Sequence, residues 1–331
     1  MAIIPTYSSL ADKRPKFCNG NDWSFVINTE VELSHLLKEI DDEHNVNGPV
    51  GVIYRGCNNA RYQQYNSAQR YWIENDLRTQ GIGYYDFLSK LLMTSKSMPV
   101  INHVFNRYGY NKNIRDFPIF ALLQHYGAPT PCLDWTYTIN SALYFAVSNS
   151  ECDGSDSIDN YMSIYRINKT KHRNEFMNYV DWSRGRELEF NSFQEWNNAS
   201  KNTNICFYLS DFEPDRFSLD TPDYRVYPSS GLQICNSITQ TSLFNQNIIL
   251  QDGLLVFNPH EDRCMERLFG TSGFEEGANI MLTPFYCYNI HKRLINFIKK
   301  NLLDHLSIND EFMFPQMSKV IQDVKRDAGV Q

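Results

Sequence analysis

Residues 119–147 constrain the fold more than any other stretch, because a helix end, a turn, a strand and a second helix follow one another there. Apolar residues at helical spacing stop at Gly127 and Pro129, which end the first helix. Residues 132–136 have the pattern of a short strand, and Thr138 stands where an N-cap would precede an apolar helix face. The stretch therefore predicts a helix–turn–strand–helix unit.

Polar side chains are crowded around the turn of this unit. They are His125, Asp134, Trp135, Thr136 and Thr138. Two interpretations are open. In the first, Asp134 and Thr138 cap the turn by accepting hydrogen bonds from backbone N–H groups. In the second, the crowded polar residues belong to a functional site.

The composition indicates a globular chain. Of the 331 residues, 42% are hydrophobic and 14% aromatic, which excludes disorder over most of the length. The net charge of −7 gives no sign of a nucleic-acid surface, although a local basic groove stays open. The 8 cysteines form no CxxC pair, so we expect free thiols, no metal site and a cytoplasmic location. No signal peptide and no apolar run of about 18 residues is found, so no membrane partner is expected.

The pattern of strand and helix signals predicts an α+β fold with few βαβ alternations. We expect two small, mostly antiparallel sheets, with a helical block at 60–125 and C-terminal helices packed outside. The strand signals lie at 50–54, 132–136, 161–167, 232–238 and 248–257. Residues 1–24 have the composition of a loose lead-in. Residues 169–230 have the least clear pattern of helix and strand signals, and we expect them to be an insertion.

Two further polar positions accompany apolar strands. Arg55 and Gly56 follow the first strand signal. A guanidinium at a sheet edge suits phosphate, because its planar fork donates two parallel hydrogen bonds; a surface ion pair is the alternative. Gln251 and Asp252, followed by Gly253, interrupt the last apolar run, which indicates a bulge or a close approach of backbone to ligand.

Together these motifs resemble the FRG domain, which is named for its (F/Y)RG motif. The matching segments are Tyr54-Arg55-Gly56, LLQHYGAPT at 122–130, LDWT at 133–136, ALYFA at 142–146 and Gln251-x-Gly253. The resemblance covers residues 25–325, so it implies a single FRG domain after the lead-in. Between the threonine and LDW the family usually has Arg-Leu, whereas this chain has Pro131 and Cys132 between Thr130 and Leu133.

The order of elements also resembles the ADP-ribosyltransferases. Those enzymes carry Arg or His on the first core strand, a Ser/Thr strand before a helix, and a last strand opened by Glu or Gln. The resemblance implies NAD as a substrate and a core of two small sheets. The residues it implies for NAD binding are Arg55, Gly56, Trp135, Thr136 and Tyr144. The residues it implies for catalysis are Arg55, His125, Asp134, Thr136 and Gln251.

Three functions stay open. The first is an NAD-dependent ADP-ribosyltransferase that acts on protein or nucleic acid, as a bacterial toxin or anti-phage defence effector with an antitoxin or regulatory partner. The second is a catalytically inactive module that binds a nucleotide or RNA, since Gln251 stands where the enzymes usually have glutamate. The third is a structural interaction protein in which His125 and Asp134 are core hydrogen-bond partners.

Overall fold

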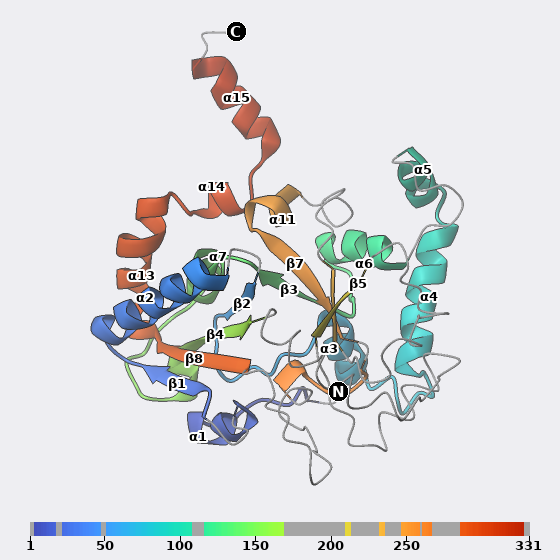
Figure 1. The fold of residues 1–331 in the computed structure, drawn as a ribbon. Helices are drawn as coiled ribbons and strands as arrows, with labels where there is room; N and C mark the ends of the chain where they lie inside the picture. The colour runs from blue at the N-terminus through green and yellow to red at the C-terminus, as the bar shows by residue number, and fades with distance from the viewer. Residues whose placement is uncertain are drawn as a thin grey trace.

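A computed structural model describes residues 3–17, 22–47, 51–107, 116–168, 209–212, 232–235, 246–258, 260–266 and 285–327. Its centre is one mixed sheet with helices on its faces and around its edges (Figure 1). The strands, in the order in which they neighbour one another, are β1 (Ser24–Ile27), β8 (Phe285–His291), β4 (Tyr161–Asn168), β2 (Val52–Cys57), β3 (Cys132–Thr136), β7 (Gly253–Phe257), β6 (Leu232–Cys235) and β5 (Leu209–Phe212). The outermost pairs, β1 with β8 and β5 with β6, are parallel, and the other neighbours are antiparallel.

The sheet is narrowest between β2 and β3. These strands pair at a single position, Tyr54 opposite Thr136. In contrast, β2 pairs with β4 from Val52 to Cys57, and β3 pairs with β7 along its whole length. Figure 1 shows β8 and β7, one from each half, running in clearly different directions. Two separate sheets are therefore not confirmed, because this one pair makes the two halves continuous.

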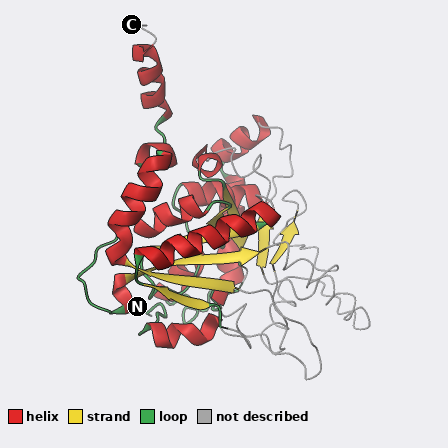
Figure 2. Cartoon of the chain, turned by 60° about the vertical axis from the view of Figure 1, so that its left-hand side comes forward, coloured by secondary structure: helices red, strands yellow, loops and turns green. Residues whose placement is uncertain are grey.

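Helices cover both halves and confirm the α+β class. The helical block predicted at 60–125 contains four helices: α3 (Ser67–Glu74), α4 (Tyr84–Ser97), α5 (Pro99–Arg107) and α6 (Asp116–His125). The other α-helices of the described residues are α1 (Leu10–Lys13), α2 (Glu30–Asn47), α7 (Ile139–Val147), α11 (Gln246–Leu250), α13 (Ile295–Ile298), α14 (Asp310–Met313) and α15 (Met317–Asp327). In both cartoon views α15 projects away from the body of the molecule (Figure 2). Within the described ranges, no helix has the length and apolar composition that a bilayer span requires.

Strand alternation sends side chains into separate cores. On β2, Ile53 packs with Trp135 and Tyr165 on one face of the sheet. Its neighbours Val52 and Tyr54 pack on the opposite face in a different cluster, which includes residues of α2 and α7. This is the period of two that a strand imposes on its side chains. A third cluster lies between β3, β7 and the helical block.

Two predicted elements are corrected. Strand β2 continues to Cys57, so Arg55 lies inside the strand and not at its end. The strand expected at 248–257 is shorter, because residues 246–250 form α11 and only 253–257 form β7. A short apolar run fits a buried helix as well as a strand, which explains the second error. Of the predicted insertion at 169–230, only residues 209–212 are among those described.

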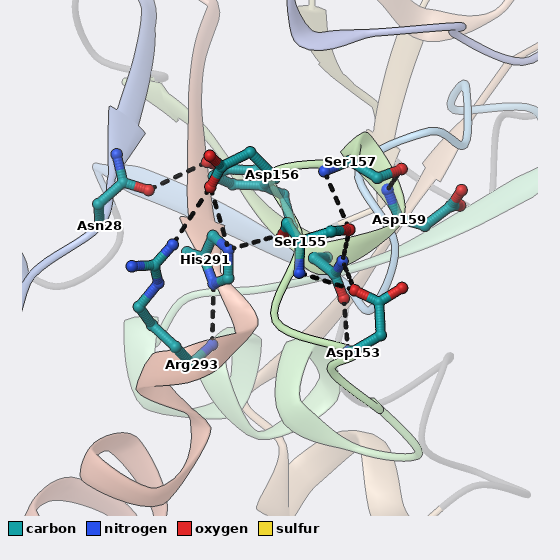
Figure 3. A network of polar contacts seen from close by, with 10 residues as sticks. Asn28, Asp153, Ser155, Asp156, Ser157, Asp159, His291 and Arg293 are labelled. Atoms are coloured by element: carbon teal, nitrogen blue, oxygen red, sulfur yellow. Dashed lines mark hydrogen bonds and ion pairs between the residues drawn. The ribbon is translucent and has the colours of Figure 1, made fainter.

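A polar network ties residues 153–159 to the end of β8 (Figure 3). The backbone N–H of Arg293 donates to His291 Nδ1 at 3.0 Å, so the ring proton resides on Nε2, which lies 3.2 Å from the Ser155 carbonyl oxygen. Asp156 forms an ion pair with Arg293. The His291 side chain is buried, and this burial lowers its pKa below the ordinary value. Burial therefore favours the neutral form of His291 more than it is favoured in a free side chain.

Candidate functional site

Arg55 bridges the two sheet halves at their junction. Its Nε donates to Gln64 Oε1 at 2.6 Å, and its Nη1 donates to the backbone carbonyl of Asp134, which lies 79 positions further along the chain. Backbone pairing between β2 and β3 ends at Tyr54 and Thr136, so this guanidinium connects the strands just beyond their last pair. The side chain is half-buried, which leaves part of it open to solvent.

The residue that anchors Arg55 is itself held by a buried carboxylate. The backbone N–H of Gln64, its partner, donates to both carboxylate oxygens of Glu266 at 2.9 Å. Glu266 is fully buried, and burial raises the pKa of its carboxyl group. A half-buried guanidinium held through such a chain of contacts has little rotamer freedom left to lose when a ligand binds.

Asp134 lies on the neighbouring strand, and its backbone carbonyl accepts from this guanidinium. The Asp134 side chain is exposed, and its Oδ2 accepts from Gln124 Nε2 at 2.9 Å. Gln124 in turn accepts from the Thr130 hydroxyl, so two residues of the LLQHYGAPT segment orient the Asp134 carboxylate. His125 ends α6 and contacts the Tyr126 ring, with 4.8 Å between ring centroids.

The capping interpretation of this turn holds for Thr138 and not for the Asp134 carboxylate. Thr138 is the N-cap of α7, because its hydroxyl accepts from the backbone N–H of Ser141 at 3.3 Å. The carboxylate of Asp134 has a different partner, the Gln124 side chain. Asp134 is thus free of the capping role that would have explained it structurally.

Gly56 is explained by packing. A Cβ atom at this position would lie 1.9 Å from the backbone oxygen of Ala142 and 3.0 Å from the backbone nitrogen of Ala146. Both atoms belong to α7, so only glycine lets this helix approach β2 so closely. The arginine and glycine of the YRG motif therefore serve different purposes: Arg55 bridges the halves, and Gly56 admits the helix.

Thr136 and Gln251 are brought together by the turn before β7. The Thr136 hydroxyl donates to the Gln251 carbonyl at 2.7 Å. The side-chain amide of Gln251 is occupied elsewhere, because Nε2 donates to the Met313 carbonyl of α14 at 2.9 Å. Thr136 also pairs with Tyr54, the neighbour of Arg55. Predicted residues from three distant segments thus meet where β2, β3 and β7 adjoin.

Motifs far apart in the sequence, YRG and LLQHYGAPT with LDWT, therefore build one junction. The FRG domain family model matches residues 51–154. This match confirms the resemblance over that range, which is less than half of the chain. It includes Arg55, His125 and Asp134, and it ends before Gln251. Comparisons with curated proteins and with solved structures gave no match.

The two aromatic residues that the resemblance implies for NAD binding lie in different cores. Trp135 is 2% exposed and packs against Phe285, with 6.2 Å between centroids. Tyr144 lies in the cluster beneath α14, where its hydroxyl donates to the Asp310 carboxylate. Burial, with Asp310 adding to it, raises the pKa of Tyr144 to about 12. Neither ring has a free face at the junction that would receive a ligand.

The junction also contains Arg70, which is not among the predicted site residues. Arg70 follows the first turn of α3, and its Nη1 donates to the Tyr65 carbonyl at 3.1 Å. Although the side chain as a whole is exposed, desolvation of its charged end and then the positive charge of Arg55 lower the pKa of Arg70. The sequence indicates its place only indirectly, because α3 begins at Ser67, soon after β2 ends at Cys57.

Metal binding finds no support in the part of the chain that the structure covers. No group of three or more His, Cys, Asp or Glu side chains is placed there so as to hold an ion. The chemistry available at the junction is that of a fixed guanidinium, an oriented carboxylate and amide groups.

Proposed function

We propose that the protein is an NAD-dependent ADP-ribosyltransferase that acts on a macromolecule, protein or nucleic acid. The observation that supports this most is the placement of Arg55 and Asp134 at the sheet junction. There a half-buried cation and an exposed, oriented carboxylate belong to neighbouring strands whose pairing has just ended. A dinucleotide needs both groups, a cation for its phosphates and an anion near the reacting ribose.

The reaction breaks the bond between ribose C1′ and the nicotinamide nitrogen. Nicotinamide leaves with the bonding electron pair, and a nucleophile of the acceptor forms the new bond to C1′. The transition state resembles an oxocarbenium ion, which the Asp134 carboxylate stabilises by its negative charge, as carboxylates do in glycoside hydrolysis. The proton lost by the acceptor passes to Asp134 or to His125, which ends the neighbouring helix.

Gln251 has a limited role in this scheme. An amide has no acidic or basic group near neutral pH, so Gln251 orients a ribose hydroxyl and does not transfer a proton. To do so, it exchanges its present bond to the Met313 carbonyl for one to the ligand. The backbone of Gln251 stays anchored through Thr136 during this exchange.

A role as a bacterial toxin or anti-phage defence effector belongs to the same proposal. A protein that modifies macromolecules at the expense of NAD damages its own cell unless it is restrained. An antitoxin or other regulatory partner therefore accompanies this function.

The proposal is tested with NAD labelled in its ADP-ribose part. Purified protein is incubated with labelled NAD and cell lysate, and the products are treated separately with protease and nuclease. Label in macromolecules that one of the two treatments releases supports the transferase and names the acceptor class. Label that stays in small molecules with every lysate argues against it.

An inactive nucleotide-binding module is the second candidate. It is favoured by one observation, the engagement of the Gln251 amide with Met313 in place of an open catalytic residue. An NAD-dependent rise in melting temperature without release of nicotinamide would select this module over the enzyme.

A further inference from the structure

Two arginines of the junction are anchored by consecutive residues of one loop. Arg55 Nε donates to the side chain of Gln64, and Arg70 Nη1 donates to the carbonyl of Tyr65. The two guanidinium groups are close enough for the charge of Arg55 to lower the pKa of Arg70, after desolvation as the larger cause. They come from different elements, β2 and α3, so the fold itself brings them together.

Neither cation of this pair forms a close ion pair within the described residues. Among the residues that the structure places, neither Arg55 nor Arg70 has a carboxylate oxygen within ion-pair distance, whereas Arg61 and Arg78 each have one. The carboxylate of Glu74, four residues further along α3, and more weakly that of Asp134 interact with Arg70 at longer range. Adjacent like charges repel each other, and an anion between them removes that cost.

The donor edges still available match phosphate. Within the described residues, the hydrogen bond of Arg70 uses Nη1, which leaves its Nε and Nη2 edge, the planar fork that holds two oxygens of one phosphate. Arg55 keeps Nη2 after its bonds to Gln64 and Asp134 in the same part of the chain. Two separately anchored donors of this kind fit two linked phosphates better than one.

We propose that Arg55 and Arg70 together form a diphosphate-binding site, so that the junction takes nucleoside diphosphates and their esters in preference to monophosphates. This inference rests on the proposed function, whose NAD substrate contains such a diphosphate. It adds Arg70 as the second binding residue, and it predicts that ligands without nicotinamide, such as ADP, bind at the same site.

The test is calorimetric titration of the full chain with ADP and with AMP at fixed ionic strength. Wild-type protein is expected to bind ADP at least about tenfold more tightly than AMP. Arg70→Gln should weaken ADP binding about tenfold or more and change AMP binding much less. Arg107→Gln is the matched control, because Arg107 is an exposed helical arginine at the end of α5, and it should leave both affinities unchanged.

Further outcomes keep the site and the transferase distinguishable. Arg70→Lys retains the charge but lacks the fork, so it should fall between wild type and Arg70→Gln. Equal affinities for ADP and AMP, or an Arg70→Gln variant that behaves like Arg107→Gln, would overturn the site even if nicotinamide is released. Preferential, Arg70-dependent ADP binding without nicotinamide release would uphold the site and remove the transferase. Melting temperatures of all variants exclude loss of fold as the cause.

Discussion

Replacing Gly56 by alanine tests how β2 and α7 fit together. The added Cβ would lie 1.9 Å from the Ala142 backbone oxygen, whereas ordinary contacts begin at 3.4 Å, so the helix or the strand must move by roughly 1.5 Å. The obstructing atoms are helix backbone and cannot rotate away. We expect a cost near the upper end for overpacking, about 3 kcal/mol, which lowers the melting temperature of a chain of this length by roughly 4 °C.

The assay is thermal unfolding followed by circular dichroism. Gly83→Ala is the control, because a Cβ at that position would meet only the movable carboxylate of Asp86, 2.8 Å away. Its effect should stay below about 1 kcal/mol. Because Gly56 adjoins Arg55, the destabilised variant should also lose ligand binding. If Gly56→Ala melts at the same temperature as Gly83→Ala, the proposed close packing of α7 on the YRG motif is refuted.

Three further predictions concern the junction and its surroundings. Asp134→Ala should change the free energy of unfolding by less than about 1 kcal/mol, because the carboxylate is exposed and its hydrogen bond in the described structure is to Gln124. It should nevertheless abolish nicotinamide release. Strong destabilisation would return Asp134 to a structural role. Gln251→Ala should lower kcat more than it weakens NAD binding, with kcat and KM measured separately; an unchanged kcat would contradict the ribose contact. The same variant should lower the free energy of unfolding by about 1 kcal/mol through the lost bond to Met313. Burial lowers the pKa of His291 from its ordinary value of 6.5, so the unfolded chain takes up this proton at a higher pH than the folded chain does. The contribution of His291 to stability is therefore complete above pH 6.5 and is lost as the pH falls below it. Urea midpoints measured for wild type and His291→Gln should converge as the pH falls through that range.

Local patterns carried most of what the sequence revealed about the fold. The unit at 119–147 was predictable because its signals act within a few residues: Gly127 ends one helix, and the Thr138 hydroxyl caps the next. The assignment failed at residues 246–250, where an apolar run without distinguishing periodicity forms α11. There the choice between helix and strand depends on packing against β7, including Ile248 over Gly253, which no local signal reports.

The site was predictable as a set of residues but not as a set of contacts. Arg55 and Asp134 were singled out because polar residues accompanied apolar elements, yet their bond depends on the register of β2 and β3. The single pair at that junction cannot be deduced from either strand alone. Arg70 was not selected as a site residue for the same reason, since its significance comes from the tertiary position of α3 beside Arg55.

Release of nicotinamide from NAD tests the central claim most directly. Wild-type protein and Arg55→Ala are compared in the presence of lysate, and folding of both is verified by thermal unfolding. The account predicts steady release by wild type and none above background by Arg55→Ala, which loses its bonds to Gln64 and to the Asp134 carbonyl. Equal release by the two proteins, or no release by wild type with any lysate or nucleic acid, would contradict it.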